Sequence, residues 1–418
     1  METKRKTAGQ QRRTLLKAGA VVAGSAALGW PALAGAQGNP IKIGHLTPLT
    51  GFLGALGAYA QQGIQMAAEE INASGGLLGR KIELISEDSV NPQVASSKAQ
   101  RMIERDNVDV LMGEINSASA LTISQVAARN KKLFMSIGAR SDALRNKDCN
   151  RYTFHIDIPV TVMVNAAGEA LLRQGLVKGK KIYALTSDYL FGHDLSRAAK
   201  NFFTRNGGTV VGDELVPTDL TDFSPQLLKI RQAKPDLVAT NLGGNQVTTF
   251  VKQYAEFGLD YPVAGFNLNT ADAWAAGEGN LGGWWPTVWH HELKTPGSQA
   301  FVQKFTQKYG RIPENHAWIE YISLKMLAQA INATKSVDTD KLIAYFESGA
   351  EFDILKARKA YFRPWDHQLM QEAYPFTVKP KGQAKNKQDF LLFGDAVPAP
   401  NEPLDKLAPP KSESTCKM

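Results

Sequence analysis

The sequence predicts an α/β protein built from two doubly wound lobes, and three observations support this fold class. Residues 41–88 run through an alternating strand, a Gly-rich loop, an amphipathic helix, a Gly turn and a second strand without interruption. The same alternation of strand and helix then recurs in two series. Beyond residue 36 about 380 residues remain, which is more than a single hydrophobic core usually supports.

The opening unit predicts where a ligand would bind. Strand 41–46 leads into loop 47–58, where glycines allow bare backbone to approach a ligand. The helix that follows, 59–73, has apolar residues at helical spacing and stops at a Ser-Gly-Gly turn. Because ligands of such folds lie beyond the carboxyl ends of the strands, the loop is expected to line a site, with Leu56 near its end.

The remaining elements continue the pattern. The first series adds helix 92–105, strand 108–112, helix 118–128 and strand 133–137. The second series comprises strand 181–186, helix 195–206, strand 209–216, helix 224–232, strand 236–241, helix 247–257 and strand 261–266. The pattern then becomes mainly helical, over 299–309, 316–333 and 339–348, before strand-like pieces near Tyr361 and over 374–378.

The first 36 residues are expected to be a cleaved export signal. Arg12-Arg13 resembles the twin-arginine pattern, the apolar run 18–28 is too short to span a bilayer, and Ala34-Gly35-Ala36 offers a cleavage site. The alternative is an uncleaved anchor. Without this segment 42 bases face 39 acids, so the formal net charge falls from +8 to +3. Neither a nucleic-acid partner nor a membrane surface is indicated.

No motif indicates catalysis, a cofactor or a metal. The sequence has no GxSxG, phosphate-binding P-loop or HExxH pattern, and GEGNLGG lacks the strand-to-helix context of a dinucleotide turn. One cluster suggests a metal, but its adjacent histidines do not converge as ligands, so we interpret it as a strand that crosses between lobes. That cluster is Trp284, Trp285, Trp289, His290, His291 and Glu292.

Six segments together resemble one family. They are IKIGHLTPLTG, INASGGLLGRKIELISEDS, VDVLMGEINSASA, SIGARSDAL, SDYLFGHDL and DFSPQLLKIRQAKPDLV. In this combination the chain resembles the periplasmic solute-binding proteins of ABC transporters that take branched-chain amino acids and related compounds. The resemblance implies a type I periplasmic binding fold, a cleft that closes by hinge motion, membrane permease subunits as partners and a monomer. The DYxFG and DFS motifs and a late cysteine are also similar to a subgroup that binds aromatic carboxylates.

The resemblance also implies discontinuous lobes joined by three crossing strands. We expect residues 37–157 and about 290–360 to form the first lobe, and residues 158–289 and about 361–400 to form the second. Residues 401–418 are a Pro-rich extended tail.

On the first lobe, Ser117 and a loop after a strand are the candidate contacts. Ser117 falls at a helix start, where its hydroxyl and the free amides can hold a carboxylate or where it only caps its helix. The resemblance implies that Ser117, Gly138, Ala139, Arg140 and Ser141 hold the carboxylate. Arg140 departs from the small hydroxyl residue of the family, and it either forms a bidentate pair with a carboxylate or points to solvent.

On the second lobe, Tyr189 and Phe191 stand where the family places aromatic contacts. The alternative is that Phe191 is a core residue and Tyr189 a surface residue. The loop with Gly243, Gly244 and Asn245 has glycine where amino-acid binders carry a bulky aromatic, which implies more room.

Two further positions bear on the ligand. Asn267 stands where amino-acid binders place a glutamate for the ligand's ammonium, which argues against an α-amino acid. His316 aligns with an aromatic cleft residue, although a lone histidine is more often a surface residue. We expect a small organic solute, namely a carboxylate, an aromatic or branched-chain compound, or an amino acid. Transport by an ABC importer and sensing for a kinase or chemoreceptor both fit the sequence.

The two cysteines, Cys149 and Cys416, are far apart in the sequence. Export to an oxidising compartment and the even count make a disulfide plausible, and it would tie the tail to the body. Two free thiols are the alternative.

Overall fold

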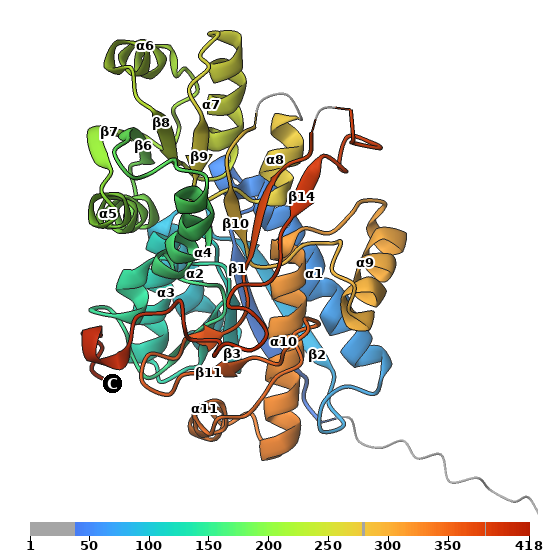
Figure 1. The fold of residues 1–418 in the computed structure, drawn as a ribbon. Coiled ribbons are helices and arrows are strands. Elements are labelled where there is room, and N and C mark those ends of the chain that lie inside the picture. The colour runs from blue at the N-terminus through green and yellow to red at the C-terminus, as the bar shows by residue number, and fades with distance from the viewer. Residues whose placement is uncertain (1–37, 278–280, 381) are drawn as a thin grey trace, which may run out of the picture. The chain divides into compact units, whose positions relative to one another are not determined.

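The computed structural model of the protein describes residues 38–277, 281–380 and 382–418. Two parallel sheets with helical connections organise these residues (Figure 1). The predicted twin-arginine signal lies outside the described residues. Among the described helices, none is both long enough and apolar enough to cross a membrane.

The first sheet has five parallel strands in the order β2-β1-β3-β4-β5. In its register Ile43, in the strand between β2 and β3, pairs with Leu84 on one side and Val110 on the other. Parallel neighbours need crossover connections, which helices supply here. The elements are β1 Ile41–Thr47, α1 Gly54–Ala73, β2 Ile82–Asp88, α2 Pro92–Glu104, β3 Val110–Gly113, α3 Ser117–Arg129, β4 Phe134–Ser136 and β5 Thr153–His155.

The second sheet has four parallel strands in the order β7-β6-β8-β9. Its elements are β6 Lys181–Ser187, α5 Leu190–Arg205, β7 Thr209–Val216, α6 Ser224–Ala233, β8 Leu237–Asn241, α7 Asn245–Glu256, β9 Val263–Gly265 and α8 Thr270–Ala276. Helix α4, Val160–Arg173, leads into this sheet. Two parallel sheets connected by helices confirm the predicted α/β class.

The late helices return to the first sheet. They are α9 Pro296–Tyr309, α10 Asn315–Thr334 and α11 Thr339–Glu347. A Cβ at Gly63 of α1 would lie 2.0 Å from the carbonyl oxygen of Ala317, so only glycine lets α1 and α10 approach this closely. Burial by itself would raise the pKa of Glu70 on α1. Hydrogen bonds from Tyr321 and two lysines, one of them Lys325 of α10, outweigh this effect and lower the pKa of Glu70 to about 2.

Short antiparallel strands form two further small sheets. They are β10 Trp285–Thr287, β11 Tyr361–Phe362, β12 Leu369–Met370, β13 Tyr374–Val378 and β14 Leu391–Phe393. The order β10-β13-β14 makes one sheet, so the Trp-rich segment does form a strand. His290 stacks on Phe393 at 3.9 Å, and burial lowers the pKa of His290 to about 3. Its ring is therefore a neutral packing group.

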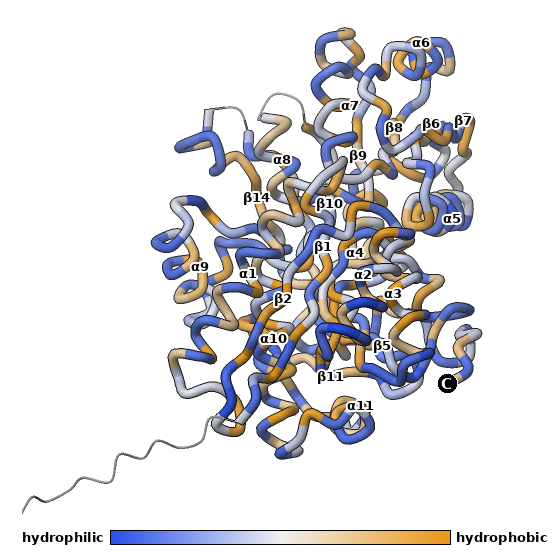
Figure 2. The backbone as a smooth tube through the Cα atoms, turned by 180° about the vertical axis from the view of Figure 1, so that it is seen from behind, coloured by the Kyte–Doolittle hydropathy of each residue, from blue (hydrophilic) through white to orange (hydrophobic). Residues whose placement is uncertain are grey.

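Apolar residues follow this architecture. Figure 2 shows hydrophobic residues along the interior strands and a larger share of hydrophilic ones on the outer helices and loops. In β3 and β8 every residue is buried, as expected for parallel strands covered on both faces.

Several helices begin earlier than the sequence predicted. Helix α1 starts at Gly54 instead of residue 59, and α5 starts at Leu190 instead of residue 195. A Cβ at Gly57 would lie 1.8 Å from the carbonyl oxygen of Pro48. The glycine therefore lets the helix pack on the loop before it, which is a different use from the predicted approach to a ligand. Helix α4, which is rich in β-branched residues, and the seven-residue α8 were not predicted.

The cysteines form a disulfide. Cys149 and Cys416 are bonded, with their Cα atoms 5.6 Å apart. The tail is held at other points as well, because its carbonyl oxygens accept hydrogen bonds from the body. Asn165 donates to Leu407 O at 2.8 Å, and Arg363 donates to Pro409 O at 2.9 Å. The Pro-rich tail is thus ordered by contacts that need no secondary structure of its own.

We predict that Cys416→Ser lowers the free energy of unfolding by about 2 to 4 kcal/mol, because the bridge restricts the unfolded chain. Urea denaturation measures this value. Cys149→Ser should lose the same amount, and the double variant should lose no more than either single one, since all three remove the same bond. Two free thiols in the denatured, unreduced mature protein would contradict the prediction.

Candidate functional site

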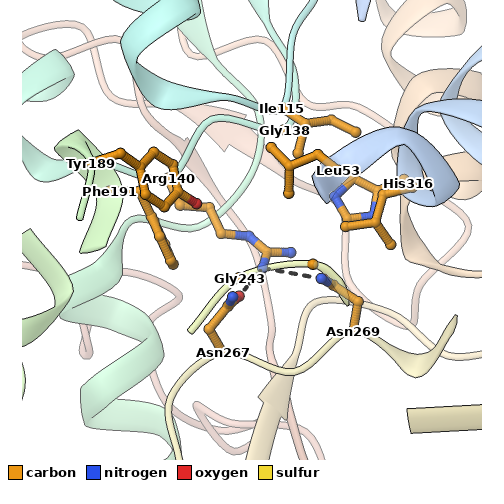
Figure 3. A pocket seen from close by; sticks show the side chains of 12 residues that line it. Leu53, Ile115, Gly138, Arg140, Tyr189, Phe191, Gly243, Asn267, Asn269 and His316 are labelled. Atoms are coloured by element: carbon orange, nitrogen blue, oxygen red, sulfur yellow. Dashed lines mark hydrogen bonds between the residues drawn. The ribbon is translucent and has the colours of Figure 1, made fainter. Parts of the chain in front are cut away.

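Residues from both parallel sheets line one cavity (Figure 3). They follow the carboxyl ends of the strands or start the helices beyond them, where α/β folds place ligands. From the side of the first sheet come Leu53, Leu56, Ile115, Gly138, Arg140 and His316, and from the side of the second come Tyr189, Phe191, Gly243, Gly244, Asn267 and Asn269.

Most of the predicted site residues meet at this cavity, but four do not. Ser117, Ala139 and Ser141 are buried and do not line it, and Asn245 is exposed at the start of α7. Leu53, Ile115 and Asn269 line the cavity without having been predicted. Asn269 lies two residues after Asn267, a spacing that an extended segment after β9 would have indicated.

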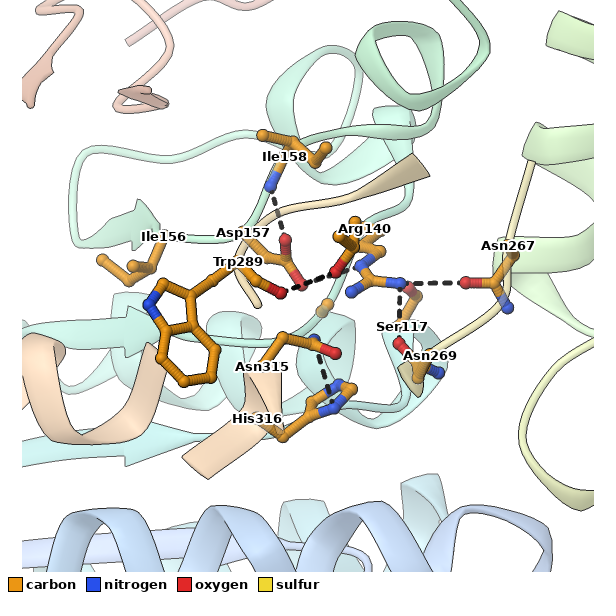
Figure 4. A network of polar contacts seen from close by, with 12 residues as sticks. Ser117, Arg140, Ile156, Asp157, Ile158, Asn267, Asn269, Trp289, Asn315 and His316 are labelled. Atoms are coloured by element: carbon orange, nitrogen blue, oxygen red, sulfur yellow. Dashed lines mark hydrogen bonds and ion pairs between the residues drawn. The ribbon is translucent and has the colours of Figure 1, made fainter. Parts of the chain in front are cut away.

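Arg140 is the central polar group of the cavity. Its guanidinium turns into the cavity and is only 8% exposed. Nε donates to Asp157 Oδ2 at 2.7 Å, and Nη1 donates to Asn267 Oδ1 at 2.9 Å and to Asn269 Oδ1 at 3.3 Å (Figure 4). Arg140 therefore joins the loop after β4 to the segment after β9, and it does not point to solvent.

Most of the donors of Arg140 are already used. A guanidinium has five N–H groups, and Asp157, Asn267 and Asn269 take three of them. With the Asn315 amide oriented so that its nitrogen donates to Glu314, its oxygen accepts from Arg140 Nη2 at 3.3 Å. One N–H remains for a ligand. The carboxylate of Asp157 balances the positive charge of Arg140. A ligand would therefore meet an oriented hydrogen-bond donor and not an unpaired cation.

The guanidinium also fills the space. The cavity volume is about 20 Å³, which is room for about one water molecule. A solute can therefore enter only if Arg140 releases Asn267 and Asn269, or if the segments that carry these residues move apart.

Ser117 is not among the residues that line the cavity, and it does not cap its helix. The cap of α3 is Asn116, whose side-chain oxygen accepts from the amides of Ala118 and Ser119. Ser117 is the first helical residue, and its hydroxyl oxygen accepts from the amide of Ser141 at 3.2 Å. The cap thus takes the amides of Ala118 and Ser119, and the predicted contact of Ser117 with a carboxylate stays a prediction.

Glu114 supports this loop from beneath. It is fully buried, its φ is +74°, and its Oε1 accepts from the amides of Ile115 and Asn116. Burial raises the pKa of Glu114 to about 8, and the nearby Glu320 acts in the same direction. Glu320 in turn lies 3.4 Å from Nε2 of the buried His45. No sequence pattern marked Glu114, because an acid just after a strand usually faces solvent.

The room predicted beside Gly243 and Gly244 is occupied. A Cβ at Gly244, whose φ is +53°, would lie 2.1 Å from Phe52 O, and a Cβ at Gly243 would lie 3.0 Å from the Tyr189 hydroxyl. Phe52 and Tyr189 meet edge to face at 5.4 Å. Phe191 is a buried core residue that also lines the cavity, so the two readings of this residue coincide.

The acidic groups near the cavity differ in position. Asn269 Nδ2 donates to Asp272 Oδ2 at 3.0 Å, and burial raises the pKa of Asp272 to about 6. Asp188 instead pairs with His193 on the surface. His316 is buried in the cavity wall, with Nδ1 3.1 Å from Glu314 Oε2. Among these acids, Asp272 is the one bonded to a residue that lines the cavity from the side of the second sheet.

We predict that Asp157→Ala lowers the free energy of unfolding by about 3 to 5 kcal/mol, because it leaves the buried Arg140 charge without a partner. Asn269→Ala, which removes a neutral acceptor of Arg140 and the amide that donates to Asp272, should cost only about 1 to 2 kcal/mol. The double variant Arg140→Met/Asp157→Ala should recover much of the loss in a urea titration. Equal losses for Asp157→Ala and Asn269→Ala would contradict the role of the charge.

We predict a pH effect at Glu114. Its pKa is about 8 in the folded protein against an ordinary 4.5, so between these values the folded state binds more protons and stability falls as pH rises. Glu114→Gln keeps an acceptor for the two amides and cannot ionise. The advantage of this variant in unfolding free energy should grow from pH 5 to 8, by at most about 1.4 kcal/mol per pH unit. A difference that stays constant over this range would refute the assignment.

Comparison with known proteins identifies the family. Residues 40–384 match a family model described as periplasmic binding protein. The Leu/Ile/Val-binding protein homolog 8 of Brucella abortus (strain 2308) is 27% identical over 323 residues, which are 73% of this chain and 79% of that protein.

Solved structures agree. A periplasmic binding protein from Burkholderia mallei is 28% identical with a TM-score of 0.83, and the match covers 90% of this chain and 98% of that one. A branched-chain amino acid ABC transporter periplasmic ligand-binding protein from Burkholderia xenovorans LB400 is 26% identical with a TM-score of 0.77, over 90% and 99% of the two chains. The family consists of transporter substrate-binding proteins and not of enzymes. The chain belongs to the periplasmic binding protein family.

Proposed function

We propose that the protein captures a small organic carboxylate in the cavity around Arg140 and delivers it to an ABC importer. The observation that carries the proposal is the orientation of Arg140. Asp157 holds the guanidinium at 2.7 Å, and its far side donates to Asn267 and Asn269 from the second sheet. A carboxylate that replaces the two amide oxygens would gain charge-assisted bonds and suit the planar fork of arginine.

The walls of the cavity support an apolar body for the solute. Leu53, Leu56, Ile115 and Phe191 contribute apolar surface, and Tyr189 adds an aromatic ring. Few polar groups in an apolar wall are typical of small-molecule sites. An aromatic or branched carboxylate fits this chemistry.

We propose that a hinge motion admits the solute. In it, residues 37–157 and about 290–360 would move against residues 158–289 and about 361–400. The small volume of the cavity supports this step, because Arg140 must leave Asn267 and Asn269 before a solute can take their place.

An α-amino acid is the second candidate, and Asp272 is the observation that favours it. This carboxyl is bonded to Asn269 and would face an ammonium if Asn269 turned aside. The Burkholderia xenovorans relative is named for branched-chain amino acids, which also supports this candidate. Against it, Asn267 cannot supply the charge that a buried ammonium needs.

We predict that isocaproate or benzoate binds to the wild type in calorimetry and that leucine binds more weakly. Arg140→Gln should lower the affinity for the acid about tenfold or more, because a hydrogen bond between charged groups is lost. Arg129→Gln on the exposed face of α3 is the matched control and should bind like the wild type.

Tight binding of leucine with neither acid detected would overturn the carboxylate assignment. Asp272→Asn should then abolish leucine binding. Delivery to an importer is tested separately, by uptake of the bound solute into cells with and without the gene for this protein. A sensory role predicts unchanged uptake.

A further inference from the structure

A second and larger cavity lies between α1 and α8, next to the cavity around Arg140. Its volume is about 730 Å³, within the range of small-molecule sites. Helix α1 contributes residues to both cavities, and α8 begins directly after Asn269. The residues that line the second cavity are Ala55, Ala58, Tyr59, Ala271, Trp274, Ala275, Arg311, Asn386, Lys387 and Gln388.

Two aromatic rings in this cavity are fixed by their own partners. The guanidinium of Arg311 lies 3.6 Å from the ring centroid of Tyr59. The indole nitrogen of Trp274 donates to Gln388 O at 3.1 Å. The four alanines between these rings expose little more than backbone and methyl groups. Such a surface accepts a flat aromatic group without displacing a long side chain.

The charge of the lining has one sign. Arg311 and Lys387 are its ionisable cations, and none of its lining residues is an acid. Arg311 Nε and Nη2 both donate to Gln62 Oε1, at 3.0 and 2.6 Å, so the plane of the guanidinium is held. Within the described parts of the chain, Nη1 of Arg311 has no acceptor and Lys387 has no ion-pair partner. Glu314, whose charge acts to raise the pKa of Tyr59, is itself paired with His316.

We propose that this cavity is a second binding site, separate from the cavity around Arg140, for an aromatic organic anion. The aromatic group lies on the alanines between Tyr59 and Trp274, and the anionic group faces Arg311 and Lys387. The combination of fixed rings, two cations and no acid in one lining determines this ligand class.

The experiment titrates the full mature chain with anilinonaphthalene sulfonate, an aromatic anion whose fluorescence rises on binding. We expect one saturable site. The double variant Arg311→Gln/Lys387→Glu should lower the affinity for the dye at least tenfold, because both charged partners of the sulfonate are lost. Trp274→Ala should also weaken dye binding, and at equal dye occupancy it should reduce the energy transfer from protein tryptophans to the dye.

Two variants serve as controls. Lys252→Glu reverses an exposed lysine on α7 and should bind the dye like the wild type. Arg140→Gln changes the first cavity and should also leave dye binding intact. N-phenylnaphthylamine, which has the same aromatic body without the sulfonate, should bind equally to the wild type and to Arg311→Gln/Lys387→Glu.

Three results would overturn the proposal. They are no saturable dye binding, equal dye affinity in Arg311→Gln/Lys387→Glu and Lys252→Glu, and loss of the dye in Arg140→Gln with the double variant unaffected. Thermal unfolding of each variant shows whether it folds. Lys387→Glu alone changes one exposed side chain, so its weaker dye binding tests the charge even if the double variant is unstable.

Discussion

The buried ion pair between Arg140 and Asp157 is the constraint on which the site depends. A guanidinium that is 8% exposed requires a partner, and Asp157 supplies it at 2.7 Å. The pair also fixes backbone, because the amide of Asp157 donates to Ile137 O and that of Val160 donates to Arg140 O. The loop after β4 and the start of α4 are thus joined at the place where the chain passes from the first sheet towards the second.

A second buried arginine supports the same loop without entering the cavity. Arg145 donates to the carbonyl oxygens of Ala139, Ser141 and Asp157, each at 2.9 Å. Those bonds occupy backbone acceptors that would otherwise be buried without a partner. The two arginines therefore have different roles. Arg145 holds the backbone of the loop in place, and Arg140 extends its guanidinium from that loop into the cavity.

The sequence indicated the fold and most of the cavity, and the failures have a physical pattern. Strand and helix alternation is a local property, so the succession of strands and helices along the chain could be predicted. The hydrogen-bond and packing partners of a side chain, in contrast, can lie far away in the sequence. Asn116 instead of Ser117 caps α3, and the glycine at position 244 makes room for Phe52 instead of for a ligand. The partners of Arg140 lie 17 and 127 residues away, and no pattern in the sequence brings Asp157 and Asn267 together.

The buried Glu114 explains why the site depends on a side chain. Helix starts commonly bind anions with free amides, but here Asn116 accepts from two amides at the start of α3, and Glu114 accepts from the two amides just before it. A carboxyl whose pKa is about 8 is mostly protonated at neutral pH, so it meets those amides without adding a full negative charge beneath the cavity. Under the proposed function, an anion in the cavity would therefore rely mainly on Arg140. Because Asp157 fixes the direction of that arginine, the proposed selection among solutes would depend on where a carboxylate could lie relative to the apolar walls, and less on charge alone.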